Sequence, residues 1–167
     1  MNFVCKSCGQ QHDLSEISIG ADAPVQWNLV SDEERANSEL GGEQCVIETR
    51  GESYLFVRAC LEIPIAGTDR VFTWGVWVSL SESSFLEMSE HWENPSRTSL
   101  GPYFGWMCTK IPEYPDTVFL KTMVYHRAVG QRPRVELEQT EHQLSTDQHQ
   151  GIEPSRLREI ISNILHT

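Results

Sequence analysis

The sequence predicts an α+β fold, in which an antiparallel sheet of about five to six strands carries a C-terminal amphipathic helix and an N-terminal zinc-knuckle-like segment. Two central segments, 54–63 and 71–80, alternate between an apolar and a polar face, as half-buried strands do. Apolar residues near the C-terminus recur at helical spacing instead. Because 167 residues is the length of one domain, we expect a single domain over 1–167, in which 1–45 contains an arm packed on a body at 46–167.

The first half of the chain is predicted to form one short helix and two strands. Ser31 and Glu34 have the spacing of a capping box, which predicts the start of a helix. The glycine pair 41–42 predicts its end. The first strand ends at Pro64, and a turn around Gly67 leads into the second. Because this turn is short, the two strands are predicted to pair antiparallel.

The second half is predicted to contain further strands and two helices. Ser81 is expected to cap a helix that closes at Asn94 and Pro95. The final helix is expected to begin near Pro154, a favoured first helical residue. The remaining segments are predicted as strands at 103–110, 118–127 and 134–138 and a solvated polar loop in 136–149.

The strongest chemical signal is a zinc-knuckle-like motif at the N-terminus. Cys5 and Cys8 are separated by two residues, and His12 follows Gly9 after two more. Structural zinc takes four Cys or His ligands, and Gly9 lets the backbone curl beneath the metal. We therefore predict a structural zinc bound by Cys5, Cys8 and His12, with Cys45 as the fourth ligand. His126 and His142 are the other candidates for the fourth position.

The two cysteines of the motif also fit two other interpretations. One is a redox pair, although that motif follows a strand and only four residues precede Cys5. The other is a pair of unliganded surface thiols. If Cys45 is not a ligand, the open position of the zinc would allow catalysis. Cys60 and Cys108 lie in strand patterns and are expected to be small core residues.

The charge excludes several classes of partner. Thirteen Lys and Arg against 24 Asp and Glu give a formal net charge of −11, which disfavours binding to nucleic acid and to anionic membranes. It suits a soluble protein or one with a basic protein partner. We see no signal peptide and no membrane-length apolar run. The five cysteines are an odd number, so we expect a cytoplasmic protein without a disulfide framework.

Two further groups of residues have the chemistry of a site. Aromatic and cationic side chains alternate on the polar face of the predicted strands, and such a face can bind an anionic or aromatic ligand. Its members are Arg58, Trp77, Tyr125 and Arg127. The alternative is that a helix or loop covers this face. Imidazole and carboxylate groups further on are candidates for acid–base or metal chemistry. These are His126, His142, Asp147 and His149.

The motifs, taken in order, resemble a bacterial family, the domain of unknown function family 2199. They are Cys5-x-x-Cys8-Gly9-x-x-His12, Phe56-Val57-Arg58, Trp74-Gly75-Val76-Trp77-Val78-Ser79-Leu80, Phe104-Gly105-Trp106 and Glu141-His142-x-Leu144. The resemblance covers nearly the whole chain and implies a bacterial, cytosolic, single-domain protein. It implies no activity and no catalytic residues. Such sequences tend to place a cysteine where Cys45 lies, which the resemblance adds in favour of Cys45 as the fourth ligand.

The sequence favours a non-enzymatic binding protein with a structural zinc and an acidic surface that meets a protein partner. One specific version is an antidote, or immunity-type, protein that neutralises a basic toxin. The alternative is a metal-assisted hydrolase or another small enzyme, with its site among His126, His142, Asp147 and His149. Nucleic-acid binding through the knuckle is disfavoured because Lys6 is the only cation in that segment.

Overall fold

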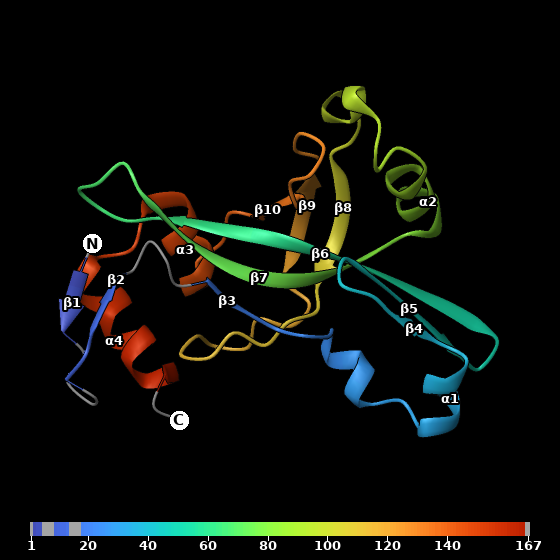
Figure 1. Cartoon of the computed structure of the whole chain (residues 1–167), viewed down its shortest axis with the longest axis horizontal. Coiled ribbons are helices and arrows are strands. Elements are labelled where there is room, and N and C mark those ends of the chain that lie inside the picture. The colour runs from blue at the N-terminus through green and yellow to red at the C-terminus, as the bar shows by residue number, and fades with distance from the viewer. Residues whose placement is uncertain (1, 5–8, 14–17, 166–167) are drawn as a thin grey trace.

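The computed structural model describes residues 2–4, 9–13 and 18–165. The fold is α+β, as predicted, and has helices at both ends of a strongly curved sheet (Figure 1). The helices are η1 (Val25–Asn28), α1 (Asp32–Ala36), α2 (Glu82–Glu90), η2 (Pro95–Ser99), α3 (Gln143–Gln150) and α4 (Pro154–Leu165). The strands are β1 (Asn2–Val4), β2 (Gln11–Asp13), β3 (Ser18–Gly20), β4 (Glu39–Leu40), β5 (Gln44–Thr49), β6 (Glu52–Pro64), β7 (Val71–Leu80), β8 (Tyr103–Met107), β9 (Lys121–Tyr125) and β10 (Arg134–Leu137).

Eight of these strands form one sheet in the order β3-β7-β8-β9-β10-β6-β5-β4, and β6 also pairs with β7. The ring β6-β7-β8-β9-β10 is therefore a closed five-stranded barrel. Successive strands of this ring run in opposite directions, so the first and fifth must run the same way. Accordingly β10 joins β6 in parallel, with Arg134 opposite Cys60. The prediction of five to six antiparallel strands was too simple, because β3 also pairs with β7 in parallel.

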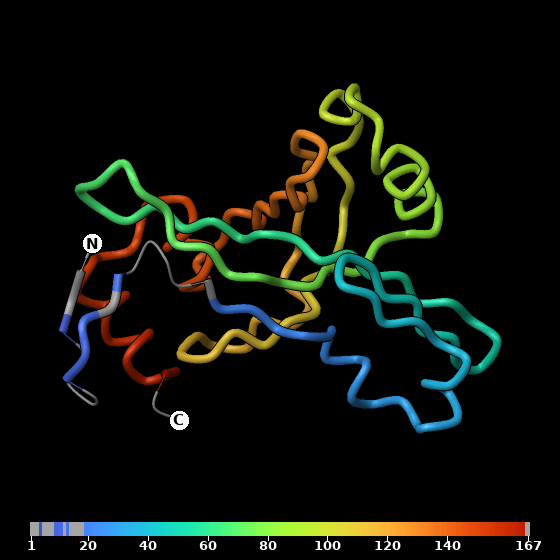
Figure 2. Tube along the Cα trace, in the orientation of Figure 1, coloured from blue at the N-terminus to red at the C-terminus, as the bar shows by residue number. Residues whose placement is uncertain are grey.

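The long hairpin of β6 and β7 runs along the length of the molecule, and Figure 2 shows it crossing from one end to the other. β6 has 13 residues and β7 has 10, which at ~3.3 Å a residue makes β6 about 43 Å long. One part of the hairpin closes the barrel, and the other carries β5 and β4 beyond it. A separate two-stranded sheet, β1 with β2, lies near α4 and the hairpin turn (Figure 1).

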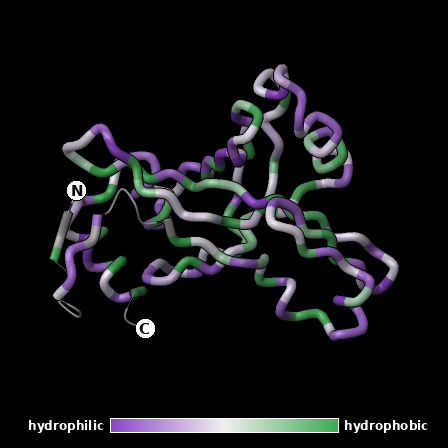
Figure 3. The backbone as a smooth tube through the Cα atoms, viewed as in Figure 1, coloured by the Kyte–Doolittle hydropathy of each residue, from purple (hydrophilic) through white to green (hydrophobic). Residues whose placement is uncertain are grey.

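The barrel interior is the main hydrophobic core. Inward-facing residues alternate with outward-facing ones along each strand, so hydrophobic and hydrophilic residues intersperse in Figure 3. The interior of β6 and β7 is contributed by Val57, Ala59, Leu61, Ile63, Phe72, Trp74, Val76 and Val78. The apolar stripe of α4 and the buried face of α2 join the same cluster. These two helices therefore stabilise the barrel by burying apolar area, at roughly 25 cal/mol per Å².

A second, smaller core lies outside the barrel, on the outer face of β5, β6 and β7. Its buried members are Cys45, Ile47, Phe56, Trp77 and Cys108. Ala21, Trp27 and Val30 from the segment between β3 and α1 pack against them. This segment is held in place by backbone hydrogen bonds, including Val25 N to Cys108 O at 2.9 Å. In this second core, the segment between β3 and α1 therefore covers the outer face of the hairpin.

The predicted helix starts are confirmed, whereas α1 ends at Ala36 and α2 at Glu90, earlier than the ends predicted at Gly41 and Asn94. Ser31 and Glu34 form the capping box of α1, Ser81 caps α2, and α4 begins at Pro154. The polar loop predicted over 136–149 was wrong, because β10 extends to Leu137 and α3 occupies the second half of this segment. Its apolar signal is weak: Leu144 is buried, but the other buried positions are Ser145 and Asp147. No helix in the described ranges has the length and apolar character needed to cross a membrane.

Candidate functional site

The predicted zinc ligands Cys5 and Cys8 lie outside the described residues, so this part of the prediction stays a prediction. His12 is placed by its backbone in β2, opposite Phe3. Asp13, its neighbour, is 3.9 Å from Arg70 just before β7. Across the described ranges, no group of three or more Cys, His, Asp or Glu residues has the geometry of a metal site.

Cys45 lies in β5, where it pairs with Phe56 of β6. Its side chain is fully buried in the outer core, and this burial raises the pKa of its thiol to about 12. Phe56 is eight residues from Pro64, the end of β6 nearest Arg70 and β2, which corresponds to about 26 Å of strand. Cys45 therefore lies in the outer core, well along the sheet from the end of β6 that is nearest Arg70, and its role as the fourth ligand stays a prediction.

Three residues of the alternative hydrolase site have local structural roles. His142 caps α3 by accepting from Leu144 N, and its Nε2 donates to Asp116 O. His149 Nε2 donates to Leu137 O at 2.8 Å. Asp147 is 4% exposed and accepts from Tyr114 and Arg156. The structure does not gather these groups around a shared reacting atom.

His126 differs from these three because it is buried without a hydrogen bond. It is 6% exposed, and neither ring nitrogen has a partner within the described part of the chain. Its ring packs edge-on against Tyr103, 5.7 Å between centroids. Burial lowers its pKa, and the charges of Arg97 and His91 act in the same direction. Burial and the neighbouring positive charges therefore favour the neutral form of His126.

The predicted ligand-binding face is partly covered. Trp77 is fully buried in the outer core, and its indole donates to Ala21 O at 3.0 Å. Arg58 lies over this ring, 5.9 Å from its centroid. Tyr125 is half-buried beneath Arg134, whose guanidinium lies 4.6 Å from the ring centroid. The covering segment is the one between β3 and α1, so the alternative interpretation of this face is confirmed at Trp77.

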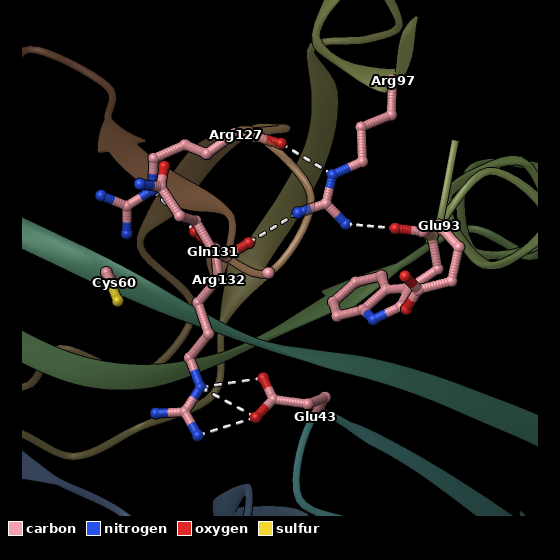
Figure 4. Close-up of a pocket in the computed structure, with 9 residues that line it drawn as sticks. Glu43, Cys60, Glu93, Arg97, Arg127, Gln131 and Arg132 are labelled. Atoms are coloured by element: carbon pink, nitrogen blue, oxygen red, sulfur yellow. Dashed lines mark hydrogen bonds and ion pairs between the residues drawn. The ribbon is translucent and has the colours of Figure 1, made fainter. Parts of the chain in front are cut away.

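Arg127 lies beside a cavity of about 530 Å³, which we call the arginine pocket. It is bounded by η2, by the β9–β10 loop and by the side of β6, and Arg97, Arg127 and Arg132 contribute to its lining (Figure 4). Arg127 itself pairs with Glu62 at 2.6 Å. The sequence did not indicate this pocket, because the three arginines are distant in the chain or lie in a loop.

An exposed aromatic surface lies on the outside of the barrel, on β8 and the loop before β9. We call it the aromatic patch and define it as Phe104, Trp106 and Phe119, which are 46%, 40% and 63% exposed. The rings of Phe104 and Trp106 meet edge-on, 5.2 Å between centroids. Phe119 N donates to Met107 O, which sets it beside Trp106. Exposed aromatic clusters of this kind mark interaction sites.

Two hollows flank the patch. One of about 210 Å³ is lined by Trp106 and Phe119, and one of about 370 Å³ is lined by Phe104. The charged residues of their walls are Lys121, Glu136 and Glu138. Lys121 lies 3.9 Å from Glu138 and Arg134 lies 3.2 Å from Glu136, so both carboxylates beside the patch have a cationic partner.

Phe119 is held in a backbone conformation that a side chain rarely adopts. Its φ is 65°, in the left-handed region that costs a residue with a Cβ about 1–2 kcal/mol. Such a residue persists only where the surrounding structure fixes it, and these residues cluster at functional sites. The exposed ring of Phe119 gains little apolar burial to offset this cost, which points to a role outside the folded chain.

The comparisons with known proteins identify a family and no activity. A family model described as "Uncharacterized protein conserved in bacteria (DUF2199)" matches residues 4–152. No curated protein matches the chain, and no solved structure matches it. The matched range contains both the arginine pocket and the aromatic patch.

Proposed function

We propose, for a chain that belongs to the uncharacterised bacterial family DUF2199, that it is a non-enzymatic binding protein whose aromatic patch docks a protein partner. The observation that carries this proposal is the exposure of Phe104, Trp106 and Phe119 together on one wall of a rigid barrel. Aromatic residues of this kind dominate binding energy at interfaces because they bury large areas with few rotatable bonds.

The charge of the whole chain indicates the chemistry of the partner. The charges beside the patch are paired, Lys121 with Glu138 and Arg134 with Glu136, but the chain as a whole has a net charge of −11. A strongly acidic protein with an apolar docking surface suits a partner whose surface is apolar and basic, since complementary potentials raise the association rate and exclude acidic partners. We therefore infer that the partner is basic.

A finer version of the proposal is an antidote that neutralises a basic toxin. The small size and acidity of the chain support this version. It predicts that a basic protein encoded beside this gene binds the patch, and that the aromatic residues are required for neutralisation. If the neighbouring basic protein binds equally well after the patch is removed, this version is wrong.

The zinc also remains a proposal, for the knuckle segment alone. Cys5, Cys8 and His12 have the ligand types and spacing of a structural site, whereas Cys45 fits it less well because it is buried in β5, in the outer core. Metal analysis of chain purified without chelators tests this. About one zinc per chain that is lost with Cys5→Ser and retained with Cys45→Ala would support the knuckle and exclude Cys45 as a ligand.

Binding to a defined peptide tests the aromatic patch. The probe is a labelled amphipathic helix of about 18 residues with Leu on one face and Lys on the other, and its counterpart replaces Lys by Glu. We expect the basic peptide to bind at least about ten-fold more tightly than the acidic one, measured by fluorescence anisotropy. Removing the patch with the double substitution Phe104→Ser and Trp106→Ser should weaken binding of the basic peptide at least about ten-fold.

Tyr54→Ser is the matched control, because Tyr54 is an aromatic residue of similar exposure, 47%, outside the patch. It should leave the affinity of the basic peptide unchanged, and circular dichroism should show each variant folded. Equal affinity for both peptides would contradict the proposed basic partner. Full binding by the folded Phe104/Trp106 double variant would contradict the patch itself.

A further inference from the structure

The arginine pocket concentrates positive charge in a strongly acidic chain. Its volume of about 530 Å³ is within the range that holds a small molecule. Arg97 and Arg132 come from different walls of the pocket, and Cys60 lies at its side (Figure 4). Arg127 contributes its backbone carbonyl to Arg97, while its guanidinium turns to Glu62. The guanidinium groups of Arg97 and Arg132 are therefore the cationic groups that a ligand in the pocket would meet.

Arg97 is a buried cation balanced only by backbone dipoles. It is 1% exposed and lies over the Trp92 ring, 5.2 Å from its centroid. Four of its N–H groups donate to carbonyls of Trp92, Arg127, Ala128 and Gln131. None of the carboxylates in the described part of the chain pairs with it. Buried charges are normally paired, and a guanidinium has five N–H groups, so one donor has no hydrogen-bond partner and the charge has no carboxylate partner among the described residues.

Arg132 shows that a carboxylate fits this pocket. Its Nε and Nη2 both bind the carboxylate of Glu43, with the shortest contact at 2.7 Å. Both side chains are 39% exposed, so the pair is at the mouth and in contact with solvent. A half-exposed ion pair of this kind contributes little to stability and opens at little cost. Glu43 therefore occupies the paired N–H donors of the Arg132 guanidinium, and a carboxylate or phosphate of a ligand would also fit them.

We propose that the arginine pocket binds a small organic anion, in which a carboxylate or phosphate group contacts Arg132 and Arg97 and a flat apolar group packs against Trp92. Arg97, Arg132 and Glu43 are among the ionic groups that line the pocket. Glu93 also lines the pocket, so the site suits a ligand with one anionic group rather than a polyanion. This site is separate from the aromatic patch and does not depend on the function proposed for it.

Protection of Cys60 from alkylation tests the proposal on the full chain. Cys60 lines the pocket and is half-buried, whereas Cys45 and Cys108 are fully buried. Alkylation by neutral iodoacetamide is followed by mass spectrometry of the peptide that contains Cys60. Benzoate and phenyl phosphate are the anionic probes, and benzamide is the neutral one. At ten times its dissociation constant, expected near ~1 mM, an anion should slow alkylation about ten-fold.

Three variants separate anion binding from a structural role of the arginines. Arg132→Gln should weaken protection at least about five-fold, and Glu43→Gln should strengthen it, because the competing charge is gone. Arg158→Gln, on the exposed face of α4, is the control and should change nothing. All three variants leave the buried Arg97 in place, and circular dichroism should show each of them folded.

The outcomes decide between the ligand sources and the proposal as a whole. Protection by benzoate alone assigns a carboxylate, and protection by phenyl phosphate alone assigns a phosphate ester. Equal protection by benzamide would overturn the proposal, because the pocket would then recognise only the ring. No protection at about 10 mM of either anion, or protection that survives Arg132→Gln, would also overturn it.

Discussion

Trp77 and Trp106 lie on the outer surface of neighbouring strands, yet one is fully buried and the other is 40% exposed. Ser79, two residues after Trp77 on the same face of β7, is opposite Trp106 of β8. Both indoles therefore point away from the barrel interior. The segment between β3 and α1 covers Trp77 and accepts its indole N–H at Ala21 O. Trp106 instead stays 40% exposed and meets Phe104 edge-on, with 5.2 Å between ring centroids.

The difference teaches that a second layer, and not strand alternation, decides which outer aromatic residues belong to the folded core. The covering segment is short and is anchored by a few backbone hydrogen bonds, such as Val25 N to Cys108 O. No other part of the described chain lies over the aromatic patch in the same way. Its residues retain apolar area that folding has not used, and this area is available to a partner.

The largest expected loss of stability follows from truncating Trp77, the covered tryptophan. Trp77→Ala should lower the free energy of unfolding by about 3–5 kcal/mol, because it opens a cavity in the outer core and leaves Ala21 O without its donor. Trp106→Ala, on the bare side, should lower it by less than about 1.5 kcal/mol, since its side chain is only partly buried. Urea unfolding of both variants measures this. Equal losses would show that the patch is core and would remove the ground for the docking proposal.

Much of the local structure could be predicted from the sequence. Period-two alternation located β6 and β7, and the capping residues Ser31 and Ser81 located two helix starts. These signals depend on neighbours in the chain, so they are visible without the fold. Barrel closure depends on β10 meeting β6, which are about 70 residues apart. No local pattern encodes that pairing.

The candidate sites were harder to predict for the same reason. In 103–107 both faces of the strand are apolar or aromatic, so the pattern cannot separate the bare Trp106 from the buried Tyr103 and Met107. Phe119 gives no signal, since its left-handed backbone is set by the tertiary contacts around it. Of the predicted ligand-binding residues, only Arg127 reaches the arginine pocket. Sequence could name the chemistry of such residues, but the fold decides which of them meet.

A smaller effect on stability, dependent on pH, is expected from the buried polar side chain of His126. His126 is 6% exposed, and burial, followed by the charges of Arg97 and His91, lowers its pKa, while Glu87 opposes them weakly. Above its ordinary value of 6.5 the ring is neutral in both states and adds nothing to the pH dependence of stability. Below pH 6.5 the unfolded chain takes up a proton that the folded chain resists, so stability falls with falling pH.

The non-titrating variant His126→Phe tests this, since phenylalanine can keep the edge-on contact with Tyr103. The difference in unfolding free energy between parent and variant should be constant above pH 7 and should shift in favour of the variant as the pH falls below 6.5. Urea unfolding from pH 7.5 to pH 5 measures it. A difference that stays constant over this whole range would show that His126 is solvated, contrary to its burial.

The smallest expected effect on stability is at Phe119, on the bare side. Phe119→Gly removes the cost of a left-handed φ of 65° for a residue with a Cβ, but it adds backbone entropy to the unfolded chain, about 0.5–1 kcal/mol. The two terms nearly cancel, so the free energy of unfolding should change by less than about 1 kcal/mol. The same variant removes the most exposed ring of the patch, and affinity for the basic peptide should fall at least about five-fold. A loss of stability without a loss of binding would mean that the ring of Phe119 serves the fold, which its 63% exposure argues against. Retained stability with lost binding is the signature of a side chain that the chain holds in a costly conformation for a partner.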